Sequence, residues 1–163
     1  MALSPLYKEA LLDALRDELR VAGFKKRGVV FHRVSADVVH LVALQSSIDS
    51  PGQIPQVTIN LALWCKPLAA RGTEPSVIAA VWRCRLGDVM PTKKDLWWTV
   101  PDKASLPKVA RGMLADLKVH GIPALDLLPD SAALFALWRG GQSPGLAASE
   151  AQRYLTALAN QPS

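Results

Sequence analysis

The residue types that most often carry out chemistry are few in this chain and lie far apart. Its three histidines, His32, His40 and His120, do not have the spacing of a metal-ligating pair. The sequence also has no nucleophile elbow, no phosphate-binding P-loop and no dinucleotide-binding glycine motif. We therefore expect neither a metal nor a cofactor. Catalysis would need a site assembled in space, for example from His32, Asp88 and Asp95.

Basic residues form the clearest charge pattern, and the formal net charge of the chain is +5. Several lie close together in sequence from Lys25 to Arg33, and Arg83 and Arg85 alternate in a later segment. Placed together in the fold, these side chains would form one cationic patch, and Trp97 would add an aromatic contact. The candidate partner-binding residues are therefore Lys25, Lys26, Arg27, Arg33, Arg83, Arg85 and Trp97. A less specific interpretation is that the first basic residues complement a helix dipole and that the later arginines only solvate a sheet edge.

The chain of 163 residues is predicted to form a single domain, with a core in residues 5–128 and a C-terminal helical extension in residues 129–160. Apolar residues make up 50% of it, which is enough for a core without metals or disulfides. No apolar run approaches the roughly 20 residues that a membrane-spanning helix needs. The first residues lack the basic-then-apolar order of a signal peptide, so we expect a cytoplasmic protein without a membrane partner.

Cys65 and Cys84 are the only cysteines, and both lie in apolar segments with strand character. Buried free thiols in a reducing compartment are the favoured interpretation. A disulfide between neighbouring strands is the alternative.

The segment 56–65 is predicted to be the strand around which the fold is organised. Val57, Ile59, Leu61 and Leu63 occur at every second position, so their side chains point to one face. The second face, together with a later strand, carries aromatic and small polar residues: Thr58, Asn60, Trp64, Trp97 and Thr99. This second face is either a protein-binding hot spot or is covered by the C-terminal helices, with its tryptophans in the core.

Further segments have the pattern of strands or helices. The other predicted strands are 29–34, 37–48, 80–85 and 96–100, and the first two form a hairpin through Ser35 and Ala36. A short helix over 76–82 is the alternative to the third of these strands. The predicted helices are 5–22, 105–121, 131–139 and a last one that begins at Ser143 and Pro144.

Capping residues set the limits of these helices. Pro5 fits the first turn of the first helix, and Gly23 ends that helix. Gly121 and Pro123 are expected to stop the second helix. Asp130 is expected to cap the third.

One helix, then a series of strands, then clustered helices is typical of an α+β fold. We predict a mainly antiparallel sheet of about five strands, with the N-terminal helix and the clustered C-terminal helices packed on it. The segment 37–48 is apolar on both faces, which indicates a central strand that is covered on both sides. The later helices are therefore expected to pack on the second face of the sheet.

Several segments resemble the 4304 family of bacterial domains of unknown function, in the same order and with similar spacing. These segments are 23–28, 31–33, 42–47, 57–61, 82–87 and 95–98, and the last two are similar to the Arg-Leu-Gly and Trp-Trp signatures of the family. The resemblance covers about residues 6–128 and leaves the C-terminal helix as an extension. It implies a compact α+β domain, and it implies no activity and no catalytic residues.

We therefore expect a non-enzymatic protein-binding domain. An immunity-type role, in which the domain neutralises a bacterial toxin with an acidic surface, fits a small domain without active-site motifs. Nucleic-acid binding through the basic patch, with tryptophan stacking on bases, is the second hypothesis. An enzyme with a spatially assembled site is the third.

Overall fold

Strand β4 (Gln56–Cys65) is the centre of the fold, because three other strands pair with it. The structure is a computed structural model that describes residues 2–47, 51–142 and 148–161. Val57, Ile59, Leu61 and Leu63 are completely buried, which confirms the inward face that their alternation predicts.

The strands of the described chain form one antiparallel sheet in the order β1, β2, β3, β4 and β5, and β6 pairs with β4 on the same edge as β5. Besides β4, they are β1 (Lys25–Arg27), β2 (Val30–Ser35), β3 (Val38–Ser46), β5 (Trp82–Arg85) and β6 (Trp98–Thr99). The predicted α+β class and antiparallel sheet are confirmed.

Two strands differ from the prediction. Residues 25–27 form the edge strand β1, which the sequence pattern does not predict. The predicted strand 96–100 is reduced to the two residues of β6. The chain just before β6 is held differently, because Thr58 Oγ1 donates a hydrogen bond of 2.6 Å to the carbonyl oxygen of Leu96.

The predicted hairpin between β2 and β3 is confirmed, with two turn residues between Ser35 and Val38. Ala36 in this turn has a φ of 51°, a left-handed conformation that suits two-residue hairpins. The predicted end of the second strand at Ile48 lies outside the described residues. The helical alternative for 76–82 is wrong, because no helix forms there and Trp82 already pairs with β4.

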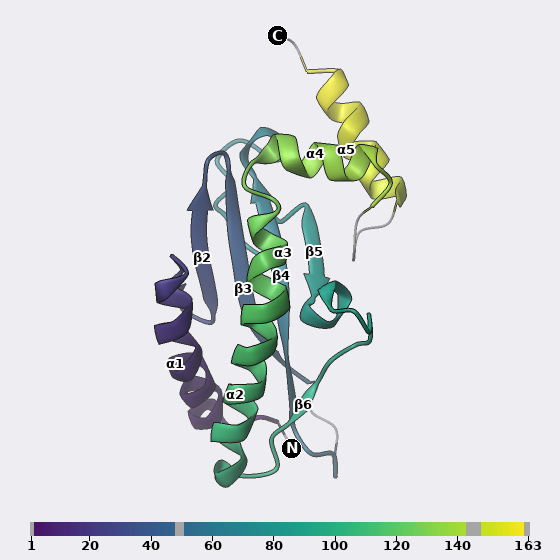
Figure 1. The fold of residues 1–163 in the computed structure, drawn as a ribbon. Coiled ribbons are helices and arrows are strands. Elements are labelled where there is room, and N and C mark those ends of the chain that lie inside the picture. Colours follow the sequence, from purple (N-terminus) through teal and green to yellow (C-terminus); the bar gives the residue numbers. More distant parts are fainter. Residues whose placement is uncertain (1, 48–50, 143–147, 162–163) are drawn as a thin grey trace.

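The helices form a layer on one side of the sheet, and the last of them extends beyond the end of the sheet (Figure 1). They are α1 (Pro5–Val21), α2 (Leu106–Asp116), α3 (Ile122–Asp126), α4 (Ser131–Arg139) and α5 (Ala148–Ala159). Leu15 of α1, Met113 of α2 and Ile59 of β4 belong to the same buried core. The prediction that the later helices pack on the second face is therefore wrong. The inward residues of the sheet form one apolar surface that accommodates α1 and α2 together.

The last helix is described from Ala148 onward, so its predicted start at Ser143 and Pro144 lies outside the described residues. It packs on α4, where the rings of Trp138 and Tyr154 stack with their centroids 5.5 Å apart. Within the described chain, no helix has the length and apolar character that crossing a membrane requires.

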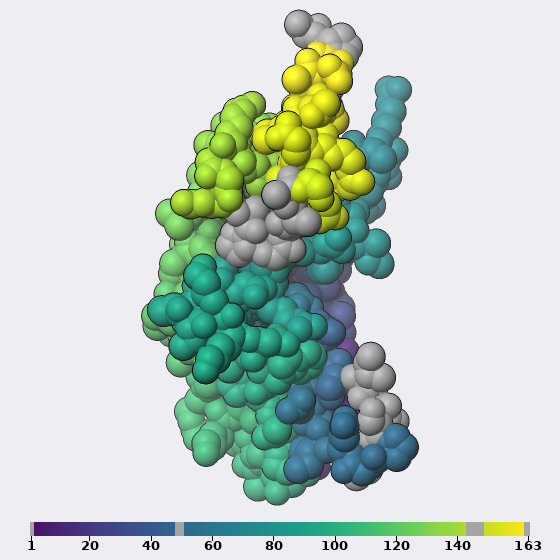
Figure 2. All heavy atoms as spheres, turned by 90° about the vertical axis from the view of Figure 1, so that its right-hand side faces the viewer, coloured from purple at the N-terminus to yellow at the C-terminus, as the bar shows by residue number. Residues whose placement is uncertain are grey.

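A loop, and not a helix, covers part of the second face of the sheet. Residues 66–81, which we call the arm, connect β4 to β5. Val77 and Ala80 of the arm pack on Leu41 and Ala62 of the sheet in a second, smaller core. In Figure 2 the arm projects on the side away from the helix layer. The arm therefore explains why β3 is apolar on both faces.

The second predicted helix does not stop at Gly121. A π-helical turn (Leu117–Gly121) joins α2 to α3, and Pro123 lies in the first turn of α3, where its missing N–H is tolerated. Gly121 is buried, and a Cβ atom at this position would lie 2.9 Å from Cδ1 of Leu86 and 2.7 Å from Cδ1 of Leu117. Glycine is needed here for close packing and not to end a helix.

The start of α4 is fixed by two carboxylates. Asp130 Oδ1 accepts a hydrogen bond of 2.8 Å from the backbone N–H of Ala133, which confirms the predicted cap. Asp37, in the β2–β3 turn, accepts hydrogen bonds from the backbone N–H of Ser131 at 2.9 Å and from its hydroxyl at 2.5 Å. These bonds attach α4 to one end of the sheet.

Cys65 and Cys84 are free and buried, which confirms the favoured interpretation of the two cysteines. Burial raises the pKa of Cys65 to about 11 and that of Cys84 to about 12. Both thiols are therefore protonated and unreactive near neutral pH.

Replacing Gly121 with alanine is expected to lower the free energy of unfolding by about 1–3 kcal/mol, because the new methyl group overpacks the contact with Leu86 and Leu117. Gly140→Ala is the matched control, since a Cβ there would meet only two carbonyl oxygens at 3.5 Å. Urea denaturation followed by tryptophan fluorescence measures both variants. Equal stability of the two variants would contradict the role assigned to Gly121.

Candidate functional site

The sheet face opposite to the helices, which we call the open face, carries two rows of side chains that cross five strands. The strand register gives the first row, from β1 to β5, as Lys25, His32, Leu41, Ala62 and Arg83. The second row is Arg27, Val30, Ala43, Asn60 and Arg85. Each row begins and ends with a basic residue. Because neighbouring strands lie about 4.8 Å apart, the two ends of a row are separated by roughly 19 Å.

The single cationic patch expected from the sequence is therefore not formed. Lys25 and Arg27 lie on β1, and Arg83 and Arg85 lie on β5, with three strands between them. The expectation that these basic segments are neighbours is wrong because the sheet order places them at opposite ends. The open face has a pair of basic residues at each end and apolar or uncharged residues between.

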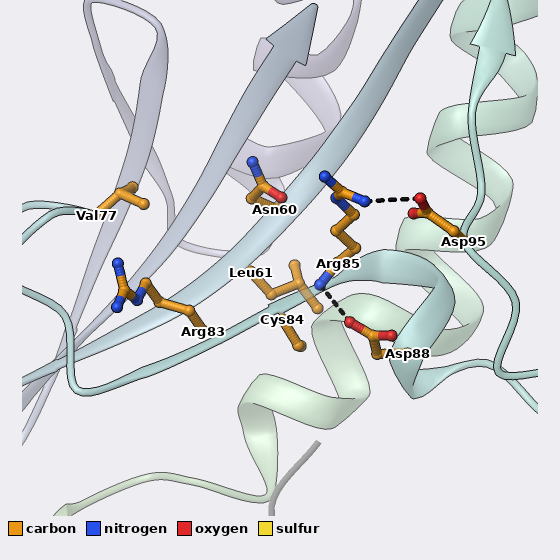
Figure 3. Close-up of a pocket in the computed structure, with 8 residues that line it drawn as sticks. All are labelled: Asn60, Leu61, Val77, Arg83, Cys84, Arg85, Asp88 and Asp95. Carbon is orange, nitrogen blue, oxygen red and sulfur yellow. Dashed lines mark hydrogen bonds and ion pairs between the residues drawn. The ribbon is translucent and has the colours of Figure 1, made fainter. Parts of the chain in front are cut away.

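Arg83 and Arg85 line a hollow of about 530 Å³ beside the arm (Figure 3). Arg85 reaches Asp95, with 2.6 Å between Nη1 and Oδ2, and its guanidinium lies 5.1 Å from the ring centroid of Trp97. Arg83 lies on the side of Val77, away from this ion pair (Figure 3). Arg83 is exposed and has no ion pair within the described residues. Arg85 is thus partly neutralised, whereas the charge of Arg83 is available to a partner.

Asp95 organises the side of this hollow that lies near Trp97. Its Oδ2 also accepts a hydrogen bond of 2.9 Å from Trp97 Nε1. This hydrogen bond and the neighbouring Arg85 guanidinium hold the pKa of Asp95 below its ordinary value. Gly87 allows the chain to approach closely here, since a Cβ atom at Gly87 would lie 1.9 Å from the carbonyl oxygen of Lys94.

A second hollow, of about 640 Å³, lies at the other end of the open face. Lys25 and Arg27 line it, and both are exposed and have no ion pair within the described residues. His32, which lies opposite Lys25 on β2, also lines it. Partial burial and the charge of Arg27 lower the pKa of His32 below its ordinary value.

Lys26 does not belong to the open face, although it lies between two residues that do. The pleat of β1 points it toward α1, where its Nζ lies 2.5 Å from Glu9 Oε1 and 3.8 Å from Asp13 Oδ1. The relative exposure of the Lys26 side chain is 20%. Lys26 therefore attaches β1 to the helix layer and is not available in the way that Lys25 and Arg27 are.

Arg33 is also turned toward the helices. Its Nη1 donates a hydrogen bond of 3.0 Å to the carbonyl oxygen of Ala22 after α1, and its Nη2 lies 2.6 Å from Asp126 Oδ1 on α3. The guanidinium carbon lies 4.6 Å from the ring centroid of Phe24. Its Nε donates a third hydrogen bond, of 3.1 Å, to Nδ1 of His40. Arg33 thus connects the sheet to the end of α1 and to α3, and it does not join the other basic residues.

The hydrogen bonds of His40 fix its protonation state. The ring is buried, and its Nε2 lies 2.7 Å from the carbonyl oxygen of Leu128. A carbonyl oxygen only accepts hydrogen bonds, so Nε2 carries the proton, and Nδ1 is the unprotonated acceptor for Arg33. Burial and the Arg33 charge lower the pKa of His40, although the bond to Leu128 and the charge of Asp126 oppose this shift. The folded protein holds His40 as a neutral ring.

The three residues suggested for a spatially assembled catalytic site do not meet. His32 lines the hollow beside β1, whereas Asp88 and Asp95 line the hollow beside β5. Asp88 Oδ2 accepts a hydrogen bond of 2.8 Å from the backbone N–H of Arg85, so it caps the turn that follows β5. Among the described residues, no group of three His, Cys, Asp or Glu side chains could hold a metal ion.

His32 and Glu74 are residues of the open face that the sequence analysis does not include among the candidate partner-binding residues. Glu74 belongs to the arm, and no periodic pattern places a loop on a sheet face. His32 could have been assigned from the turn at Gly28, whose φ of 63° closes a two-residue hairpin between β1 and β2. Recognising that hairpin would have placed Lys25 opposite His32.

Comparison with known proteins gives one match. A family model described as "Domain of unknown function (DUF4304)" matches residues 15–127, which is more than half of the chain. No curated protein matches this chain, and no solved structure does.

Replacing Arg33 with methionine is expected to lower the free energy of unfolding by about 2–3 kcal/mol, because Nδ1 of His40 loses its donor and Asp126 loses its ion pair. Arg83→Met is the matched control, since the exposed Arg83 has no ion pair within the described chain. Urea denaturation measures both. The same stability in the two variants would show that the Arg33 contacts do not stabilise the fold.

The free energy of unfolding is expected to fall as the pH is lowered from 7.5 to 5.5. The pKa of His40 in the folded protein is below its ordinary value of 6.5, so the unfolded chain binds a proton first as the pH falls. The contribution of His40 is therefore fully present above pH 6.5 and is lost below it. His32, whose pKa is also lowered, acts in the same direction. Urea denaturation at several pH values in this range gives the free energy of unfolding as a function of pH. This free energy should change less with pH in His40→Gln than in the unchanged protein, and His32→Asn is the comparison. The same pH dependence in His40→Gln as in the unchanged protein would contradict the neutral His40 ring.

Proposed function

The chain belongs to the DUF4304 family of domains of unknown function, and we propose that it is a non-enzymatic domain that binds another protein through its open face. The observation that carries this proposal is the pair of rows that cross the open face, each with a basic residue at both ends. A partner with acidic groups at a matching separation would neutralise both ends at once. Charges arranged in this way favour one orientation of the partner and raise its association rate.

The exposed basic residues at its two ends favour the open face as the binding surface, whereas Leu41 and Ala62 in the middle of the first row are buried beneath the arm. The opposite face of the sheet is covered by helices. On the open face, Lys25, Arg27 and Arg83 are exposed and have no ion pair within the described residues, so binding would neutralise them without breaking an existing ion pair. Trp97 and Arg85 supply a packed aromatic and guanidinium pair, which is the combination that often dominates binding energies in protein interfaces.

The specific role that we propose is that of an immunity-type protein, which neutralises a bacterial toxin by covering an acidic surface on it. Such a protein needs a rigid surface and no reactive group. The open face supplies a rigid surface, because its strands are held from behind by the helix layer. This role is an analogy from size, charge and the lack of active-site motifs.

Nucleic-acid binding is the second candidate, because Trp97 lies beside Arg85 and single-strand-binding proteins stack bases on aromatic rings next to basic residues. Two observations favour a protein partner over it. Trp97 is half-buried and is already in contact with Arg85. Asp95, an acidic residue, lies next to both and would repel a phosphate.

A double charge reversal tests the proposal. In Lys25→Glu/Arg83→Glu, one basic residue at each end of the first row becomes acidic. The control, Lys103→Glu/Lys108→Glu, changes the charge by the same amount near α2. The candidate partners are purified proteins encoded next to this chain in its genome, and binding is measured by surface plasmon resonance at several salt concentrations.

We expect a partner that binds the unchanged protein and the control equally, with an association rate that falls as salt rises. The open-face variant should bind it at least about tenfold more weakly. Two results would contradict the proposal. One is the absence of any partner whose binding depends on Lys25 and Arg83. The other is a gel shift of a labelled single-stranded 20-mer of DNA or RNA by the unchanged protein that the open-face variant loses, which would support nucleic-acid binding instead.

A further inference from the structure

The hollow beside β1 brings three nitrogen donors together on the open face. Lys25 and Arg27 lie two residues apart on β1, so their side chains leave the same face of the strand. His32 lies directly opposite Lys25 on β2. The backbone positions are therefore separated by about 5 Å across the strands and by about 7 Å along β1. Three donors at these separations can surround one tetrahedral group.

We propose that this hollow binds an oxyanion of the phosphate class through Lys25, Arg27 and His32. A phosphate group offers three oxygens to three donors that approach from different directions, whereas a single carboxylate offers two. The site rests on the proposed function in one respect only, because the hollow forms one end of the face on which a partner would dock.

The charge of the hollow suits an anion. Lys26 also lines it, but its ammonium group is paired with Glu9 on α1. Glu74, on the arm, is the one acidic residue among the described lining residues, and it is exposed. Lys25 and Arg27 have no ion pair within the described chain, so the hollow has an excess of positive charge before any ligand binds.

Apolar walls make this charge more effective. Val34, Val39 and Pro75 line the hollow together with the basic residues. Val34 is exposed, but Val39 is buried and Pro75 is half-buried, and the attraction between a bound anion and the donors becomes stronger where less water is present beside these two residues. The volume of about 640 Å³ exceeds that of a free phosphate ion. A phosphate monoester with an organic group therefore fits better than the bare ion.

His32 provides a readout of binding. The groups that face it in the hollow are Lys25 and Arg27 on β1 and Glu74 on the arm, and its neighbour across β3 is the uncharged Leu41. A bound dianion would offset the charge of Arg27, which is one of the two causes that lower the pKa of His32. The pKa of His32 should therefore rise when the anion binds. The buried His40 faces the helices and serves as an internal reference.

The experiment is a titration of the full chain with phosphoserine and with inorganic phosphate in a low-salt buffer at pH 7.5, followed by NMR of the histidine rings. Malonate, a dicarboxylate, forms a second arm that distinguishes phosphate from carboxylate chemistry. The variants are Lys25→Ala/Arg27→Ala, Glu74→Gln and, as the matched control, Lys103→Ala/Lys108→Ala.

We expect saturable shifts of the His32 resonances with phosphoserine and a higher His32 pKa in the bound form. Removing Lys25 and Arg27 should weaken binding by at least about tenfold, since each supplies a charge-assisted hydrogen bond. Glu74→Gln should strengthen binding, and the control should leave it unchanged. Shifts that do not saturate, that persist in Lys25→Ala/Arg27→Ala, or that malonate reproduces at the same concentration would overturn the phosphate site.

This result can be separated from the protein-binding proposal. Saturable phosphoserine binding without any protein partner would support the site and contradict the docking function. A protein partner whose binding depends on both Lys25 and Arg83, together with the absence of phosphoserine binding, would support the docking function and overturn the site.

Discussion

The guanidinium of Arg33 holds the two layers of this fold together. It contacts the end of α1 through Ala22, the sheet through His40 and α3 through Asp126. His40 continues the connection to the carbonyl oxygen of Leu128, beyond α3. Arg33 can donate a hydrogen bond to Nδ1 of His40 only while that nitrogen is unprotonated. The positive charge of Arg33 in turn favours the neutral form of the His40 ring. The network attaches α1 and α3 to the sheet on the face that the apolar core also covers with helices.

The pleat of β1 divides its three basic residues between the two faces of the sheet. Lys25 and Arg27 point to the open face, whereas Lys26 points to Glu9 on α1. The consecutive basic residues of β1 therefore have two different roles. One part stabilises the attachment of the sheet to the helices, and the other part remains at the surface. Side-chain direction in a strand, with its period of two, decides which residue has which task.

The sequence predicts those features that depend on local pattern. The burial of Val57 to Leu63 follows from alternation, and the start of α4 follows from Asp130 as a cap. The order of the strands is not local, so no local pattern predicts the separation of β1 from β5, and the prediction of one basic patch is wrong. The prediction that Gly121 ends a helix is wrong for a related reason. Glycine often ends a helix, but here its lack of a side chain is needed because Leu86, from a distant part of the chain, packs against it.

The separation of the basic residues bears on the kind of partner that the open face could bind. A compact cationic patch attracts any polyanion, and a flexible single strand of nucleic acid adapts to almost any arrangement of charges. Two basic ends that four strand spacings hold roughly 19 Å apart require a partner that has acidic groups at the same separation. The arm borders both hollows, because Glu74 and Pro75 line one and Val77 lines the other, so a ligand that reaches both ends must also fit around the arm. A folded protein surface has acidic groups at fixed positions and a fixed shape, and it can meet both conditions without losing the conformational freedom that a flexible chain would lose.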